Sequence, residues 1–198
     1  MNMPRNILIL SLLLSLTACV SPGIQSVKSS SELGSDEIIL VGKIRLVPKY
    51  DPSEQDLPTL MFNKDMVKDK LFVAIDSEHK PLDDYATFSG IDKVASVDFN
   101  KTFMIAAKRT QPLIFSGAFF MISAERSADF YQLPGGLKFN YGKKDKAIYI
   151  GTIEFHRNDY DEITRVSLID EYKEANKVFK KIHGKKLSLK KIKPVVLK

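Results

Sequence analysis

The densest group of candidate metal ligands in the sequence is the segment from His156 to Glu162. Within it, Asn158, Asp159 and Asp161 offer oxygen atoms of the kind that calcium binds, and Glu162 adds a further carboxylate. The spacing of these residues matches no calcium-binding loop, and strand-like sequence flanks the segment on both sides. We therefore expect a solvated connection between two strands rather than a metal site.

Catalytic arrangements are equally hard to find in the sequence. His79, His156 and His183 lie too far apart to form a local ligand pair, and Cys19 is the only cysteine. The chain contains no G-x-S-x-G elbow, no H-E-x-x-H motif, and no S-x-x-K motif with its companions. The glycine-containing segment Leu133–Gly136 is not followed by the Lys-Ser/Thr pair of a phosphate-binding loop, so it predicts a turn. We predict no catalytic residue, no metal and no cofactor.

Charge is the strongest remaining signal. The whole chain carries a formal charge of +6, or +5 without Arg5. Residues 176–198 hold nine lysines and no acid, which leaves about −4 for residues 19–175. Lysines close to a membrane attract anionic head groups by about 1 kcal/mol each. The alternative is a solvated helix face and a lysine-bearing edge strand at Lys185–Lys191. The candidate contacts are Lys177, Lys180, Lys181, Lys185, Lys186, Lys190, Lys191 and Lys193.

A short hydrophobic segment precedes Cys19. Arg5 is the only charged residue before it, and the apolar run from Ile7 to Leu16 is shorter than the roughly 20 residues that span a bilayer. One positive charge, a short apolar run and small residues at its end are typical of a secretory signal peptide. We therefore expect residues 1–18 to be a signal peptide.

The four residues Leu16-Thr17-Ala18-Cys19 resemble the lipobox of bacterial prelipoproteins. The resemblance implies cleavage before Cys19 and a diacylglycerol group on its sulfur, so that acyl chains hold the mature protein on a membrane. In that family an aspartate after the cysteine retains lipoproteins at the inner membrane. This signal is the usual one in enteric-type bacteria, so Val20 favours the outer membrane, facing the periplasm, over the inner membrane. The alternative is an ordinary secretory signal that leaves Cys19 as a free thiol.

The sequence after the cysteine divides into two parts. Residues 19–36 are rich in serine and glycine and show no apolar period, so we expect a lipidated, flexible tether. The chain as a whole is 44% hydrophobic and 27% charged, which is close to the average for globular domains. We expect residues 37–198 to form a single domain that ends in a basic segment.

The domain is predicted to be mainly β. Alternation and β-branched enrichment indicate strands at residues 38–46, 71–75, 93–99, 102–107, 113–123, 136–141, 147–155 and 163–169. The first should be half-buried, with Lys43 and Arg45 on its polar face. The apolar run 113–123 predicts a central strand buried on both faces, with a bulge at Gly117. The spacing predicts an antiparallel β-sandwich of about seven to nine strands.

Two local units stand out in the second half of the chain. Residues 137–141 and 147–153 predict a hairpin joined through Gly142. Residues 171–183 predict a C-terminal amphipathic helix, capped by Asp170 and Gly184. Its expected apolar face consists of Tyr172, Ala175, Phe179 and Ile182. From Lys138 to Gly184 the sequence resembles small uncharacterised periplasmic lipoproteins with a transthyretin-like sandwich, which implies that architecture and no catalytic residues.

These features favour a non-enzymatic structural or interaction module of the bacterial envelope. Its expected partners are the membrane, reached through the acyl groups, and an anionic envelope component or another envelope protein. We do not expect nucleic acid as a partner of an exported lipoprotein. The alternative is a periplasmic ligand-binding protein or an envelope hydrolase, with a site built from dispersed residues in a deep pocket. Aromatic residues at strand spacing would line such a pocket, although they more commonly form the core.

Overall fold

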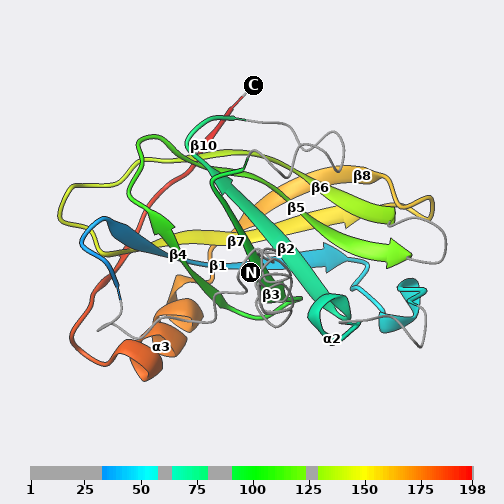
Figure 1. Cartoon of the computed structure of the whole chain (residues 1–198), viewed down its shortest axis with the longest axis horizontal. Coiled ribbons are helices and arrows are strands. Elements are labelled where there is room, and N and C mark those ends of the chain that lie inside the picture. Colours follow the sequence, from blue (N-terminus) through cyan, green and yellow to red (C-terminus); the bar gives the residue numbers. More distant parts are fainter. Residues whose placement is uncertain (1–32, 58–63, 80–90, 124–128, 198) are drawn as a thin grey trace, which may run out of the picture.

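The computed structural model describes residues 33–57, 64–79, 91–123 and 129–197. The predicted signal peptide, Cys19 and most of the predicted tether lie outside the described residues. Within the described part, ten strands and three helices follow one another (Figure 1). They are β1 (Glu37–Val47), η2 (Pro52–Glu54), α2 (Lys64–Val67), β2 (Lys70–Asp76), β3 (Lys93–Asp98), β4 (Phe103–Lys108), β5 (Leu113–Ser123), β6 (Asp129–Phe139), β7 (Ala147–Arg157), β8 (Ile163–Ile169), α3 (Tyr172–His183), β9 (Leu189–Lys191) and β10 (Val195–Val196).

The strands form two sheets. Sheet A has the order β4-β1-β7-β8, with β9 also paired to β7, and sheet B has the order β10-β6-β5-β2-β3. The prediction of a mainly β, sandwich-like domain with one amphipathic helix near the C-terminus is confirmed. The prediction of a purely antiparallel sandwich is wrong, because β7 pairs in parallel with both β1 and β9. Parallel pairing needs a long connection, and about a hundred residues separate β1 from β7.

The predicted hairpin between residues 137–141 and 147–153 is also wrong. β6 pairs with β5 and β10 in sheet B, whereas β7 pairs within sheet A, so the chain between them crosses from one sheet to the other. Arg109 holds this crossing by donating to the carbonyl oxygens of Gly142, Lys143 and Asp145. The Asp145 carboxylate also accepts the Gly142 N–H at 2.7 Å. These contacts give the connection a bent path without strand pairing.

The main hydrophobic core lies between the two sheets. Its largest side chains include Phe115, Phe120, Phe139 and Phe155, each with no exposed surface. β5 lies between β6 and β2 and is buried along most of its length, as predicted. The register of β5 shifts beside Gly117, which confirms the predicted bulge. The aromatic residues of these strands therefore fill the sandwich.

A second hydrophobic cluster lies on the outer face of sheet A, under α3. Ile39 and Val41 of β1 pack there against Ala175 and Phe179 of the helix. For this reason β1 is buried on both faces over residues 38–44, and the prediction that it is half-buried is wrong. Sheet A is thus a layer between sheet B and α3, and polar side chains on its outer face must find partners within the protein.

Helix α3 occupies almost the predicted range, with two differences. Glu171 is the N-cap residue, although Asp170 accepts the Tyr172 N–H at 3.2 Å. Gly184 ends the helix, as predicted. The buried face contains His183 in place of Ile182, whose side chain is 46% exposed.

Candidate interaction surface

All eight lysines predicted to contact an anionic surface are exposed. They lie on the solvent side of α3, in the turn that follows it, and along residues 190–193. Two of them form ion pairs with described residues: Lys190 Nζ lies 2.9 Å from Asp145, and Lys191 Nζ lies 2.6 Å from Asp170. The others, including Lys193, make no ion pair within the described part of the chain. We use the name basic surface for Lys177, Lys180, Lys181, Lys185 and Lys186.

The position of the basic surface is fixed by the packing beneath it. Phe179 is completely buried in the cluster between α3 and sheet A, and Leu187 packs against the same cluster from the turn after the helix. A buried phenylalanine contributes on the order of 3 kcal/mol, which is enough to hold one face of a three-turn helix. The lysines therefore extend from a helix of fixed orientation and from the turn that follows it.

The first described residue of the chain lies beside α3. Leu33 packs against the cluster that contains Phe179 and Leu187. Figure 1 shows this first segment, in blue, at the same end of the domain as α3. Any segment that precedes Leu33 must therefore enter the domain beside α3 and the basic surface.

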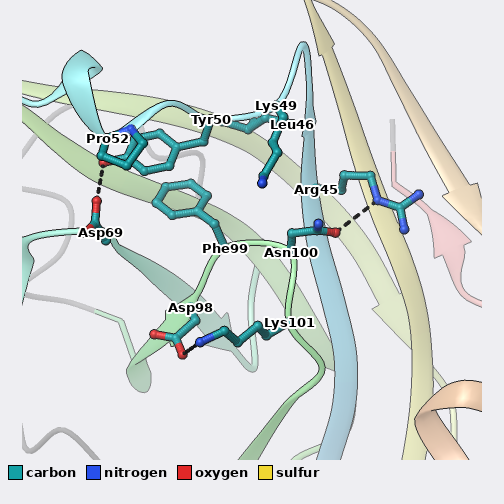
Figure 2. Close-up of a pocket in the computed structure, with 10 residues that line it drawn as sticks. All are labelled: Arg45, Leu46, Lys49, Tyr50, Pro52, Asp69, Asp98, Phe99, Asn100 and Lys101. Atoms are coloured by element: carbon teal, nitrogen blue, oxygen red, sulfur yellow. Dashed lines mark hydrogen bonds and ion pairs between the residues drawn. The ribbon is translucent and has the colours of Figure 1, made fainter.

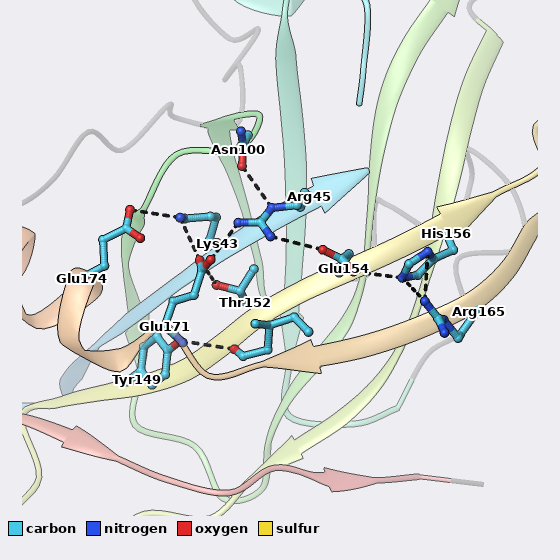
Figure 3. A network of polar contacts seen from close by, with 11 residues as sticks. Lys43, Arg45, Asn100, Tyr149, Thr152, Glu154, His156, Arg165, Glu171 and Glu174 are labelled. Carbon is cyan, nitrogen blue, oxygen red and sulfur yellow. Dashed lines mark hydrogen bonds and ion pairs between the residues drawn. The ribbon is translucent and has the colours of Figure 1, made fainter. Parts of the chain in front are cut away.

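A network of charged side chains attaches the beginning of α3 to the strands (Figure 3). Lys43 of β1 is 7% exposed, and its ammonium lies 2.8 Å from Glu171 and 3.1 Å from Glu174. Burial opposes the charged form, but the hydrogen bonds to the two glutamates raise the pKa of Lys43 above its usual value. Lys43 thus lies on the face of β1 that α3 covers.

Glu171 is the centre of this network. Its carboxylate also accepts from Arg45 at 2.8 Å and from the Thr152 hydroxyl at 2.8 Å. The hydrogen bond from Lys43, opposed by partial burial and reinforced by Arg45 and Thr152, lowers the pKa of Glu171 to about 2. A carboxylate that stays ionised at neutral pH cannot act there as a general acid. Its role in the fold is to bind the first turn of α3 to β1 and β7.

The network continues across sheet A towards the edge strand. Arg45 also lies 3.2 Å from Glu154 of β7, whose other oxygen lies 2.9 Å from His156. Arg165 of β8 lies 2.8 Å from the His156 ring (Figure 3). Charged side chains of three neighbouring strands therefore contact one another on the outer face of the sheet.

The segment from His156 to Glu162 contains the last two residues of β7 and the connection to β8, and the two strands pair as an antiparallel hairpin. Asn158 organises the turn: its Oδ1 accepts the N–H groups of Tyr160 and Glu162, and its amide donates to the Glu162 carboxylate at 2.8 Å. Tyr160 is 86% exposed. The prediction of a solvated connection between strands is confirmed, and the oxygen atoms of Asn158 are used within the turn.

The three histidines have different surroundings. His156 belongs to the charged network, and His79 lies close to Gly136 of β6. His183 is 4% exposed, and neither of its ring nitrogens has a hydrogen-bond partner in the described structure. The His183 ring packs against the Phe179 ring. Burial lowers the pKa of His183, so the ring is neutral at pH 7. Within residues 33–57, 64–79, 91–123 and 129–197, no three His, Cys, Asp or Glu residues gather in a way that could hold a metal.

A pocket of about 230 Å³ opens where β1 ends, next to the connection between β3 and β4 (Figure 2). Tyr50 and Phe99 form its aromatic wall, with stacked rings whose centroids are 4.1 Å apart. The core residue Phe120 packs edge-on against both rings. The apolar part of this pocket is therefore an extension of the core between the sheets.

The polar groups around the pocket bond mainly to one another. The Tyr50 hydroxyl lies 2.7 Å from Gln55 and 3.1 Å from Asp69, and burial raises its pKa. Lys101 lies 3.0 Å from Asp98 (Figure 2). A ligand would have to displace these contacts, so the pocket is a weaker candidate site than the basic surface.

The sequence reasoning missed the charged network and the position of Leu33. The sequence predicts a polar strand face for Lys43 and Arg45. The signal for the burial of Lys43 is the pair Ile39 and Val41, which are apolar on that same face. For Glu171 the sequence predicts only a place at the start of the helix. No single segment shows that these side chains meet, because Lys43 and Glu171 are 128 positions apart in the sequence.

No helix in the described part of the chain is long and apolar enough to cross a membrane. Comparisons with protein-family models, with curated proteins and with solved structures find no match for this chain.

Proposed function

We propose that this protein is a bacterial envelope lipoprotein, anchored by acyl groups on Cys19, whose domain is a non-enzymatic interaction module. In this proposal the basic surface contacts the anionic head groups of the membrane that holds the anchor. The observation that carries the proposal is the packing of Leu33 in the same cluster as Phe179 and Leu187. A chain that leaves the domain beside the basic surface would bring these lysines close to the membrane.

The chemistry of the basic surface suits this role. Lysine presents a compact, hydrated charge on a flexible stem, which matches mobile head groups better than a single shaped ligand. Each lysine near an anionic membrane contributes about 1 kcal/mol, and salt screens the attraction within a Debye length of about 10 Å at 0.1 M. Since described residues do not neutralise Lys177, Lys180 or Lys181, their charges are available to a partner.

The experiment is vesicle binding by the chain from Val20 to Lys198, which lacks the predicted signal peptide and anchor. Vesicles of phosphatidylcholine with 30 to 40% phosphatidylglycerol should sediment it at low salt, whereas pure phosphatidylcholine vesicles should not. Lys177→Gln with Lys181→Gln should weaken binding by about tenfold to thirtyfold, because two lysines contribute about 2 kcal/mol.

The matched control removes two charges elsewhere on the domain. Lys49 and Lys68 are exposed and lie beyond the other end of β1, so Lys49→Gln with Lys68→Gln should weaken binding by less than about threefold. Equal losses in both double variants would show attraction by net charge alone and would contradict a localised basic surface. Binding that does not depend on anionic lipid would contradict the proposal itself.

The two alternatives from the sequence are a ligand-binding protein and a hydrolase. The first gains some support from the pocket beside Tyr50 and Phe99. It predicts that a small molecule from an envelope extract stays bound to the purified protein and protects it against thermal unfolding, an effect that mass spectrometry and calorimetry would detect.

A further inference from the structure

β8 forms an edge of sheet A with an unusual composition. It pairs with β7 on one side, and no described strand pairs with its other side. Val166, Leu168 and Ile169 are 43%, 41% and 37% exposed. Natural proteins commonly protect such edges with lysine or proline, and the seven residues of β8 contain neither. Arg165 is the only charged residue of the strand.

The exposed side chains of β8 continue the hydrophobic core. Val166 lies opposite Phe155, and Leu168 lies opposite Ile153. Both β7 residues are completely buried between the sheets. Because residues directly opposite each other in an antiparallel pair point to the same face, Val166 and Leu168 face the core side of sheet A. Sheet A ends at β8 among the described strands, so a further strand beside β8 would extend the core.

We infer that a second copy of this chain supplies that strand, with the two β8 strands pairing antiparallel about a two-fold axis at Ser167. In this register Val166 of each copy lies opposite Leu168 of the other copy. The two-fold axis therefore produces two such pairs, in which these exposed apolar side chains cover each other. Arg165 lies opposite Ile169 of the other copy. The charge pattern favours self-pairing in this register, because no like charges oppose each other.

Neighbouring registers fit less well. Centring the axis on Arg165 would place two arginines opposite each other, and centring it on Val166 would place Leu168 opposite Thr164 of the second copy. The Ser167 register is therefore the one that buries both apolar residues and avoids repulsion. It would join two copies of sheet A into one continuous sheet. This inference does not depend on the basic surface.

The experiment is disulfide trapping of the full chain in bacterial membranes. In Ser167→Cys the two new thiols lie directly opposite each other, with Cα atoms about 5 Å apart, which is within disulfide range. Mild oxidation should convert most of the protein into a dimer on a non-reducing gel, and reductant should reverse it. The unmodified chain is the control for a cross-link through Cys19, which is its only cysteine.

Thr164→Cys is the matched control, because Thr164 is an exposed residue of the same strand. Its two copies would lie about 20 Å apart along the paired strands, so it should cross-link at least tenfold less. Adding Val166→Lys to Ser167→Cys should reduce the dimer at least tenfold, because like charges then lie next to the axis. A monomeric Ser167→Cys protein, or equal trapping at positions 164 and 167, would overturn the inference.

Discussion

Replacing Glu171 by glutamine should destabilise the domain in a way that depends on pH. Glu171 receives hydrogen bonds from Lys43, Arg45 and Thr152, and the substitution keeps its size while removing its charge. Lys43, which is 7% exposed, would retain only Glu174 as an ionised partner. The removal of one partner from a largely buried ion pair leaves the other charge poorly compensated.

The size of the effect follows from the pKa of Glu171. It is lowered from 4.5 to about 2, and each unit corresponds to about 1.4 kcal/mol, so the ionised form is favoured in the folded protein by roughly 3 kcal/mol. The carboxyl side chain is 22% exposed, and solvent screening reduces this figure. We expect Glu171→Gln to lower the free energy of unfolding by about 2 kcal/mol at pH 7.

The pH dependence has a defined sign. Because folding lowers the pKa of Glu171, the unfolded chain binds more protons between pH 4.5 and about 2. The stabilisation is therefore present in full above pH 4.5 and is lost as the pH falls towards 2. The difference in the free energy of unfolding between the original protein and Glu171→Gln should therefore decrease as the pH falls over the same interval.

Urea unfolding followed by circular dichroism from pH 7 to pH 3 measures this difference. Glu174→Gln is the matched control, since Glu174 also contacts Lys43 but has a 58% exposed side chain, and it should cost less than about 1 kcal/mol. Equal losses in the two variants, or a loss from Glu171→Gln that is as large at pH 3 as at pH 7, would refute this account of the network.

Two further substitutions test the packing. Burial lowers the pKa of His183, so the folded domain should lose stability as the pH falls below about 6.5. His183→Leu should abolish most of that loss, as measured by thermal unfolding from pH 7 to pH 5. A Cβ on Gly135 would lie 2.0 Å from the carbonyl carbon of Ser116 in the paired strand, so Gly135→Ala should cost about 2 kcal/mol or more. Unchanged pH dependence in the first variant, or an unchanged melting temperature in the second, would contradict these assignments.

Local patterns in the sequence predicted most of the elements but not all of their partners. The eight expected strands are present, and the bulge at Gly117 lies where a glycine interrupts an apolar run. The turn predicted at Leu133–Gly136 is wrong, because β6 continues through these residues. The error between β6 and β7 arose because a short connection with a glycine has the same local sequence in a hairpin and in a crossing between sheets. The contacts that decide the path come from Arg109, about thirty residues earlier.

Burial of the outer face of sheet A could be predicted only by combining distant segments. On the outer face of β1, Ile39 and Val41 form an apolar pair between charged residues. Their side chains find apolar contacts from the helix only when α3 lies over them. Ala175 and Phe179 lie on the buried helix face as predicted, but His183 takes the place of Ile182, because both residues border the buried stripe. The position of α3 on the sheet, rather than hydrophobicity, placed histidine in the interior.

The intact mass of the mature protein from bacterial membranes tests the central proposal most directly. For the original chain, we expect the loss of residues 1–18 and the addition of acyl groups to Cys19. The Cys19→Ala variant should remain unprocessed or be released from the membrane. An unacylated mature chain with a free Cys19 thiol would contradict the anchor and leave the basic surface without a membrane beside it.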